Sequence, residues 1–343
     1  MSVPGVVVGH SINGHQGITA RGARSSLDIL TPLEMQIDTS FDLASVTKLV
    51  ATTSALMELV SKGELEVDDK VSQFLPQWKT SEKSEISLRH LLTHRSGLAE
   101  WRPLYISAHD ADHAHQLIAT TELRYGVNEA RHYSDLGFIT LGKVITSITQ
   151  QSLCDSINKL SFANMGLTAT QFTRPLDLTN VAATSRGDRY EKNMVATQDP
   201  YQVVEVVESF NNWRTHVLSG EVNDGNAFHL FGGVSSHAGL FSTAKDLLLF
   251  GETLLQHTTL PSFIEDGPDS DFHLGFRSWI DTCGSCTTRF YGHTGFTGVI
   301  FVFSPLHSSV LVVLTNRMHV DVAPTATETI FAPYLKSFHC QFH

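Results

Sequence analysis

The stretch that decides the fold is FDLASVTKLVATTSALMELVSKG, residues 41–63. Its apolar residues recur at helical spacing, which predicts a helix over 46–61, and Gly63 is a typical helix stop. Ser45 therefore lies at the start of this helix, and Lys48 follows three residues later on the same face. The spacing brings a hydroxyl within hydrogen-bond reach of an amine at a helix N-terminus.

This pair of residues suits nucleophilic catalysis. Serine is a weak nucleophile until a neighbouring group takes its proton. An amine that is shielded from water has a lowered pKa, so Lys48 could act as the base for Ser45. The helix N-terminus adds positive potential where an oxyanion forms. The pattern is short, however, and by itself it favours an N-capping serine beside a solvated lysine.

Working outward from this helix, strand-like runs lie near both ends of the chain and helical patterns fill the middle. The predicted strands are 5–10, ahead of the hairpin signal Asn13-Gly14, then 272–280, 290–303 and 310–315. The further predicted helices are 87–94, 113–120, 136–149, 153–164, 243–256 (N-capped by Ser242 or Thr243) and 325–337.

This order of elements predicts an α/β protein of the α+β type, in which an antiparallel sheet is flanked by helices and interrupted by a mostly helical insertion. We expect a discontinuous sheet domain from residues 1–63 and 225–343 and a helical domain from 64–224. A site is expected in the cleft between them, shaped by loops 101–112 and 190–222.

Tyr133-Ser134-Asp135 forms a second element, just ahead of the helix expected over 136–149. A phenol relays a proton when a nearby ammonium stabilises its ionised form, and Asp135 is a suitable acceptor to hold Lys48. The ordinary interpretation is a packed tyrosine whose neighbours cap the helix, and the pattern alone favours it.

His293-Thr294-Gly295 forms a third element, inside the strand expected over 290–303. Glycine there lets a substrate backbone approach closely, and the N–H of Phe296 is placed to form an oxyanion hole with the N–H of Ser45. A strand with a glycine bulge explains the same residues without function. The joint occurrence of all three elements, in this order and in the expected structural contexts, favours the catalytic interpretation.

At these residues the chain resembles the class C β-lactamase-like serine hydrolases, a family that includes esterases and D-amino-acid peptidases related to penicillin-binding proteins. The resemblance runs through segments 41–48, 91–98, 133–138, 233–242 and 293–298. It implies a β-lactamase/transpeptidase-like fold and needs no metal ion or organic cofactor. The implied roles are nucleophile for Ser45, proton transfer for Lys48 and Tyr133, oxyanion hole for the N–H groups of Ser45 and Phe296, and substrate binding for Asp135, His293, Thr294 and Gly295.

Two residues depart from the family pattern. Asp135 replaces the usual asparagine, and its charge favours the ammonium form of Lys48, which shifts the base role toward Tyr133. His293 replaces the usual lysine, and a weaker, pH-dependent cation there favours neutral acyl esters over carboxylate-bearing substrates.

The predicted function is therefore that of an esterase-type serine hydrolase, which forms a covalent acyl-enzyme with a small-molecule acyl substrate. A D-amino peptidase, a penicillin-binding protein or a weak β-lactamase would use the same acylation step. The alternative outside the enzymes is a catalytically silent binding module of the same fold, and the intact Ser45, Lys48 and Tyr133 argue against it.

Composition excludes several kinds of partner. The 343 residues carry a net charge of −11, whereas nucleic acids and anionic membranes require a basic surface. No run reaches the roughly 20 apolar residues of a membrane span. The first 17 residues lack the pattern of a secretory signal, which predicts a cytoplasmic protein, or a periplasmic one if a signal has been removed. The oligomeric state stays open.

Other conspicuous residues have ordinary explanations. Four cysteines are too few for a disulfide framework, and Cys283 and Cys286 are interpreted as loop cysteines because no second Cys or His pair lies at ligand spacing. His94 and Arg95 are expected to be structural. His237 either borders the cleft or is a hydrogen-bonded loop histidine.

Overall fold

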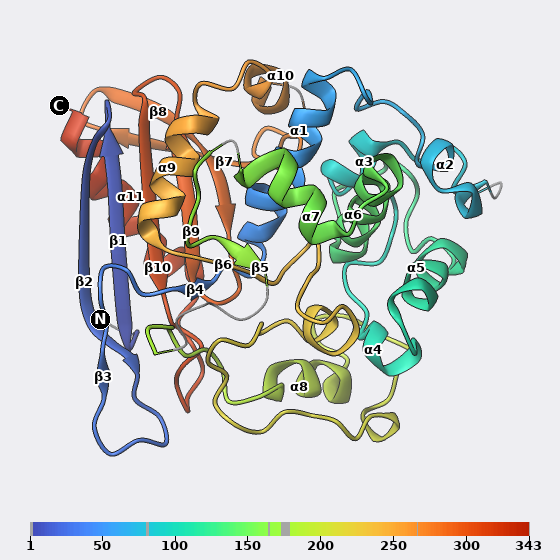
Figure 1. The fold of residues 1–343 in the computed structure, drawn as a ribbon, viewed down its shortest axis with the longest axis horizontal. Coiled ribbons are helices and arrows are strands. Elements are labelled where there is room, and N and C mark those ends of the chain that lie inside the picture. Colours follow the sequence, from blue (N-terminus) through green and yellow to red (C-terminus); the bar gives the residue numbers. More distant parts are fainter. Residues whose placement is uncertain (1–2, 80–81, 164, 173–178, 266, 343) are drawn as a thin grey trace.

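The computed structural model describes residues 3–79, 82–163, 165–172, 179–265 and 267–342, and its largest element is a seven-stranded antiparallel sheet. The strands are β1 (Gly5–Ile12), β2 (His15–Ser25), β3 (Leu33–Glu34), β7 (Arg277–Cys283), β8 (Cys286–Thr294), β9 (Val299–Ser304) and β10 (Ser309–Thr315). Their order across the sheet is β3-β2-β1-β10-β9-β8-β7 (Figure 1). Strands from the two ends of the chain meet where β1 pairs with β10. The predicted antiparallel sheet is confirmed.

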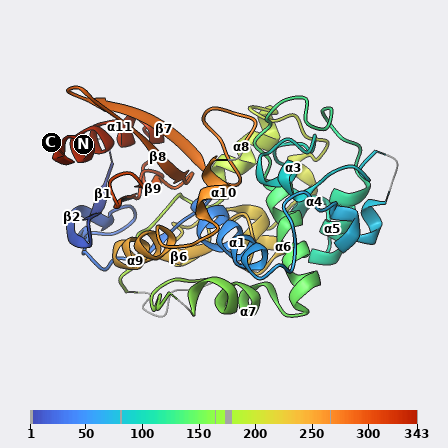
Figure 2. The same cartoon turned by 90° about the horizontal axis from the view of Figure 1, so that it is seen from above.

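Helices cover both faces of this sheet. On one face α9 (Ala244–Leu254) packs against β1, β9 and β10, and on the other α11 (Thr327–His339) packs against β7 and β10 (Figure 2). Every residue of β9 and β10 is buried, because side chains on both faces meet other elements. This explains why the two strands are apolar without alternation.

Between the two halves of the sheet most of the regular elements are helices, as predicted. The π-helical turn η1 (Lys48–Thr53) continues into α1 (Ser54–Ser61). The other helices are α2 (Val71–Phe74), α3 (Leu88–Leu92), α4 (Leu104–Ser107), α5 (Ala111–Thr120), α6 (Asp135–Thr149), α7 (Leu153–Ile157), α8 (Arg189–Thr197) and α10 (Leu260–Glu265). Short 3₁₀ or π-helical turns are η2 (Pro76–Trp78), η3 (Asn158–Phe162), η4 (Val207–Ser209), η5 (Asn226–Leu230) and η6 (Cys340–Phe342). Strands β4 (Phe41–Asp42), β5 (Gln171–Phe172) and β6 (Leu240–Ser242) form a small second sheet, in which β4 leads directly to Ser45.

Residues that were predicted to form a turn, end a helix or cap a helix do so in the structure. Asn13 and Gly14 both have positive φ, 51° and 81°, in the hairpin between β1 and β2. Gly63 ends the helix that begins after Ser45, with a φ of 69°. The side chain of Thr243 caps α9 by accepting from the N–H of Asp246 at 3.3 Å.

Two strand predictions were wrong in extent. The run 290–303 is not one strand, because the chain turns back at residues 295–298 and divides it into β8 and β9. The N–H of Gly295 donates to the carbonyl of Val299 at 2.7 Å, and the N–H of Gly298 donates to the carbonyl of Gly295 at 3.0 Å. The run 272–280 contributes to β7 only from residue 277 onward.

The interpretation of Cys283 as an ordinary loop cysteine was also wrong. Cys283 ends β7 and forms a disulfide with Cys340, 57 residues away, just after α11. Sequence spacing could not reveal this pair, because the fold brings the two segments together. Cys286 is a free cysteine at the start of β8.

The main hydrophobic core is continuous between the sheet and the helical region, since it contains Phe250 and Phe301 together with Leu91 and Phe138. The division into sheet and helical domains at residues 63 and 225 stays a prediction. No helix in the described part of the chain is long and apolar enough to cross a membrane.

Candidate active site

Ser45 lies at a sharp turn between β4 and the first helix. The preceding residue, Ala44, has a φ of 45°, a conformation that non-glycine residues rarely adopt. The Asp42 carboxylate stabilises it by accepting from the N–H of Ala44 at 2.8 Å. The helix then begins at once, since the N–H of Lys48 donates to the carbonyl of Ser45 at 3.1 Å. The turn presents the Ser45 side chain to the cleft.

Lys48 is fully buried and faces Ser45, as the spacing of the two residues predicts. Its Nζ donates to Ser45 Oγ and to the carbonyl oxygen of His237, both at 3.0 Å, and lies 2.6 Å from Asp135 Oδ1. Burial lowers the pKa of Lys48, but the Asp135 carboxylate and Tyr133 outweigh burial, so the pKa is raised. Lys48 is therefore an ammonium at neutral pH.

Tyr133 lies directly before α6, where Ser134 caps the helix by accepting from the N–H of Gly137 at 3.2 Å. Burial raises the pKa of Tyr133, although Lys48 acts in the opposite direction. The phenol is therefore neutral at rest. Its buried hydroxyl has no well-directed hydrogen bond to any described residue, so it is available to a substrate or to Ser45.

His94 holds Tyr133 in place. Its Nδ1 accepts from the N–H of Ser134 at 2.9 Å, and its ring lies 4.3 Å from the Tyr133 ring. Burial keeps the pKa of His94 well below its usual value, so the imidazole is neutral. The structural role predicted for His94 thus includes orienting a residue of the site.

The turn between β8 and β9 forms the opposite wall of the cleft. A Cβ on Gly295 would lie 2.6 Å from the carbonyl oxygen of Leu43, so only glycine lets this turn approach the Ser45 loop so closely. Thr297 Oγ1 donates to the carbonyl of Asp42 at 2.8 Å, and Arg317 Nε donates to the carbonyl of Phe296 at 2.8 Å. These contacts hold the segment that carries the Phe296 N–H against the Ser45 loop.

His293 is buried at the end of β8 and does not act as a cation. Its Nδ1 donates to the carbonyl of Thr294 at 2.7 Å, because a carbonyl can only accept. Burial, with Lys48 and Arg277 nearby, keeps the pKa of His293 well below its usual value. A neutral imidazole therefore faces the site, in place of the pH-dependent cation expected from the sequence.

Arg277 supplies a cation that the sequence analysis missed. It stands on β7 opposite Gly292 of β8, and its Nη1 donates to Thr294 Oγ1 at 2.7 Å. Its guanidinium forms no ion pair with any carboxylate in the described ranges. Arg277 reaches the site because the register of β7 and β8 places it opposite Gly292. That register cannot be identified before the sheet is known.

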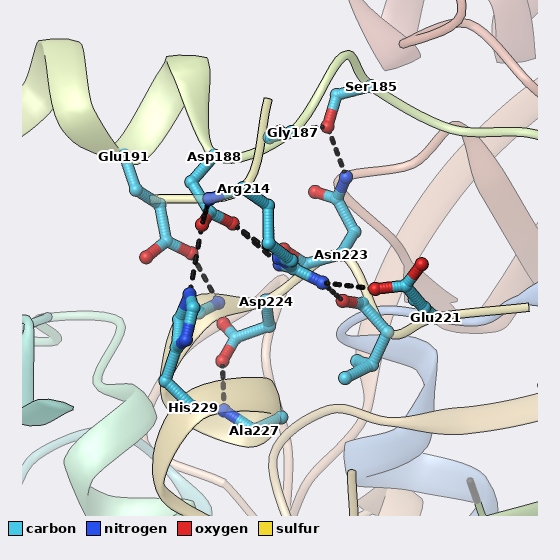
Figure 3. A network of polar contacts seen from close by, with 12 residues as sticks. Ser185, Gly187, Asp188, Glu191, Arg214, Glu221, Asn223, Asp224, Ala227 and His229 are labelled. Atoms are coloured by element: carbon cyan, nitrogen blue, oxygen red, sulfur yellow. Dashed lines mark hydrogen bonds and ion pairs between the residues drawn. The ribbon is translucent and has the colours of Figure 1, made fainter. Parts of the chain in front are cut away.

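A polar network around Arg214 and Asp188 borders the cleft (Figure 3). Arg214 and Asp188 form a buried ion pair at 2.6 Å. Next to it, the N–H of Asn223 donates to Asp42 Oδ2 at 2.6 Å and so supports the Ser45 loop. Asp224 Oδ1 accepts from His237 Nε2 at 3.0 Å, and the carbonyl of His237 in turn binds Lys48. His237 is therefore a positioning residue below the cleft.

The cleft has a volume of about 590 Å³ and contains the residues predicted for the site, with Lys48 directly behind Ser45. Segments 101–112 and 190–222 were predicted as loops, but α4 lies within the first and α8 extends into the second. They contribute Trp101, Glu191, Met194, Pro200 and Tyr201 to the cleft, and Glu191 and Met194 come from α8. The predicted residues in its lining are Ser45, Tyr133, Asp135, His293, Thr294, Gly295 and Phe296.

One group at the base of the cleft has the composition of a metal site. Asp135, Asp224 and His237 each bring a ligand atom within 4.8 Å of the others. The ammonium of Lys48 already lies against Asp135 and provides a positive charge there, so the arrangement suits a lysine-centred site.

The comparisons with known proteins agree with this geometry. The sequence model of the Beta-lactamase family matches residues 1–332. The chain belongs to the Beta-lactamase family. Like other members of that family it is a serine hydrolase with a mixed α/β fold built on a large antiparallel sheet, and the resemblance stated from the sequence is confirmed.

Two relatives and one solved structure are similar to this Beta-lactamase family member over most of its length. A putative D-alanyl-D-alanine carboxypeptidase of Escherichia coli strain K12 is 30% identical over 323 residues, which cover 85% of this chain and 72% of that protein. An N-acetylmuramyl-L-alanine amidase of Bacillus subtilis strain 168 is 30% identical over 324 residues, covering 85% and 71%. A class C beta lactamase from Rhodobacter sphaeroides superposes with a TM-score of 0.69 at 18% identity, covering 99% and 95%.

Proposed function

We propose that this serine hydrolase cleaves amide substrates that carry a free carboxylate beside the scissile bond, as a carboxypeptidase does. The observation that carries the proposal is Arg277, a guanidinium without a carboxylate partner among the described residues that lines the cleft and donates to Thr294. Arginine binds carboxylates through paired N–H donors. The relative named as a putative D-alanyl-D-alanine carboxypeptidase supports the same substrate class.

In the proposed reaction Ser45 Oγ bonds to the acyl carbon, and the oxyanion is held by the N–H groups of Ser45 and Phe296. Lys48 and Tyr133 accept the proton of Ser45, the C–N bond breaks, and the leaving amine takes up that proton. Water attacks the acyl-enzyme, the acid leaves, and the Ser45 hydroxyl is restored. Asp135, His293, Thr294 and Gly295 line the substrate channel in this proposal.

The charges at rest indicate how Ser45 is activated. Because the pKa values of Lys48 and Tyr133 are both raised, the resting pair holds an ammonium and a neutral phenol. The pair must lose one proton before it can accept the proton of Ser45. We therefore propose that Lys48 and Tyr133 act as one proton-transfer unit, with activity rising on the alkaline side of neutrality.

Ester hydrolysis is the second candidate, favoured by the neutral His293 that replaces the usual lysine. The two candidates differ in their need for Arg277. The sequence-based preference for neutral esters assumed that no other cation faces the site, and Arg277 removes that assumption.

The test compares an N-acyl-D-alanyl-D-alanine with its C-terminal amide, using wild type and Arg277→Gln. We expect wild type to prefer the free acid, and the variant to lose that preference through a fall of roughly 10- to 100-fold in kcat/KM for the acid alone, since a hydrogen bond to a charged group contributes about 1.5–3 kcal/mol. Arg131→Gln is the matched control, because Arg131 lines the same cleft but is paired with Asp271 at 2.7 Å. If Arg277→Gln keeps the preference, or if only p-nitrophenyl acetate and butyrate are cleaved, the ester candidate replaces this one.

The Cys283–Cys340 disulfide bears on the compartment. We propose that the protein works where disulfides persist, because thiols stay reduced in the cytoplasm of most cells. Acid-quenched alkylation of the protein in its cells should leave Cys283 and Cys340 unlabelled, and labelling of both would instead support the cytoplasm.

A further inference from the structure

We propose that Cys286, His307 and His339 bind one divalent transition-metal ion of the zinc class. The three side chains each bring one ligand atom to within 4.8 Å of the other two. None of them lines the catalytic cleft, so this site is separate from the reaction at Ser45. α11, which ends at His339, lies at the C-terminal end of the chain marked in Figure 1.

The ligands come from three segments that are distant in sequence. Cys286 begins β8, His307 lies in the turn between β9 and β10, and His339 ends α11. The disulfide holds two of these segments together, because Cys340 directly follows His339 and Cys283 stands opposite Cys286 in the β7–β8 hairpin. The cross-link therefore fixes the end of α11 beside the cysteine ligand.

Neighbouring side chains contact the two imidazoles and orient them, as hydrogen-bond partners orient the histidine ligands of bound metals. The Asp281 carboxylate accepts from His339 Nδ1 at 2.6 Å, which leaves the lone pair on Nε2. A carboxylate behind a ligating histidine fixes the ring and raises its basicity. Thr288 Oγ1 lies 2.9 Å from His307 Nε2 and 3.7 Å from Cys286 Sγ, and so connects the other two ligands.

The donor set determines the class of ion. Thiolate and imidazole suit zinc and related borderline metals, whereas calcium and magnesium prefer oxygen ligands. Metal–ligand distances of about 2.0–2.3 Å place tetrahedral ligand atoms roughly 3.5 Å apart, so the site closes by about 1 Å through side-chain rotation. The thiolate and the Asp281 carboxylate bring two negative charges toward the dication, although Lys336 Nζ also lies 3.9 Å from that carboxylate.

The experiment titrates the metal-free, disulfide-bonded protein with Co²⁺ and then displaces it with Zn²⁺. We expect one equivalent to bind with a thiolate-to-cobalt charge-transfer band in the near ultraviolet, and Zn²⁺ to abolish that band. Cys286→Ser should lose the band, and Asp281→Asn should weaken binding roughly 10- to 100-fold. Cys154→Ser, which removes the other free cysteine, should bind as wild type does.

Three results would overturn the proposal. They are the absence of binding by wild type, an unchanged band in Cys286→Ser, and binding that begins only after the disulfide is reduced, which would assign the metal to Cys283 and Cys340. His307→Gln provides a second ligand variant, and circular dichroism of each variant separates loss of the site from loss of the fold. The charge-transfer band also separates this site from the oxygen-rich cluster at Asp135, which contains no thiol.

Discussion

Replacement of Asp135 by asparagine should move the alkaline activation of the enzyme to lower pH. Asp135 Oδ1 lies 2.6 Å from the buried Nζ of Lys48, and its charge is the largest influence that raises the pKa of that amine. For charge centres about 4 Å apart and an effective dielectric constant near 20, the interaction is about 4 kcal/mol, or roughly 3 pH units at 1.36 kcal/mol per unit. Observed shifts for such pairs are about 1–3 units.

The direction of the pH shift follows from which protonation state of the Lys48 and Tyr133 pair is active. Wild-type kcat/KM should rise as pH passes the raised pKa of the Lys48 and Tyr133 pair, because the protonated pair cannot accept the Ser45 proton. Without the carboxylate, the ammonium loses its proton more readily, so the rising limb should move down by about 1–3 pH units. The prediction concerns the position of the rising limb and not the height of the kcat/KM plateau above it. Asparagine retains one oxygen that can accept a hydrogen bond from Lys48.

The assay is the pH dependence of kcat/KM for a p-nitrophenyl ester, corrected for hydrolysis without enzyme. Asp112→Asn is the matched control, because Asp112 pairs with Lys143 at 2.8 Å on the surface and its loss should leave the limb unmoved. If the rising limb of the pH profile stays in place in Asp135→Asn, or moves to higher pH, the proposed protonation states of Lys48 and Tyr133 are refuted.

Three further predictions concern the approach of the two cleft walls and the stability of the fold. Gly295→Ala should reduce kcat/KM by about 100-fold, because its methyl group would lie 2.6 Å from the Leu43 carbonyl and displace the turn; similar kinetics would refute this close approach. Cys340→Ser should lower the free energy of unfolding by up to about 4 kcal/mol through the lost 57-residue cross-link, as chemical denaturation can measure, and an unchanged midpoint would contradict it. Burial raises the pKa of Asp42 from 3.8 to about 6, so its stabilising contribution is complete below about pH 4 and is lost as pH rises through 6. Relative to Asp42→Asn, wild type should therefore lose about 3 kcal/mol between pH 4 and pH 7, and a constant difference would count against that shift.

The parts of the fold that could be predicted are those with local signals. The hairpin at Asn13 and Gly14, the cap at Ser242 or Thr243 and the periodic helix after Ser45 each follow from a few neighbouring residues, and the structure places the cap at Thr243. The approach of Lys48 and Tyr133 to Ser45 was predicted from ordered motifs, and the described geometry brings these side chains together.

The parts that could not be predicted depend on distant contacts. Arg277 meets Thr294 through the register of two strands, and Cys283 meets Cys340 because α11 packs against β7. The charge of His293 also escaped prediction, since burial decides it and burial is a property of the whole fold. Residues 295–298 were predicted as part of one strand, because β-branched and aromatic residues lie on both sides of them, in 290–294 and in 299–303.

The most direct test of the central claim is mass spectrometry of the protein quenched with acid during turnover of an acyl substrate. The account predicts one acyl group per chain on the peptide that contains Ser45, and no adduct and no turnover in Ser45→Ala. An acyl group on another residue, or full hydrolysis by Ser45→Ala, would contradict it.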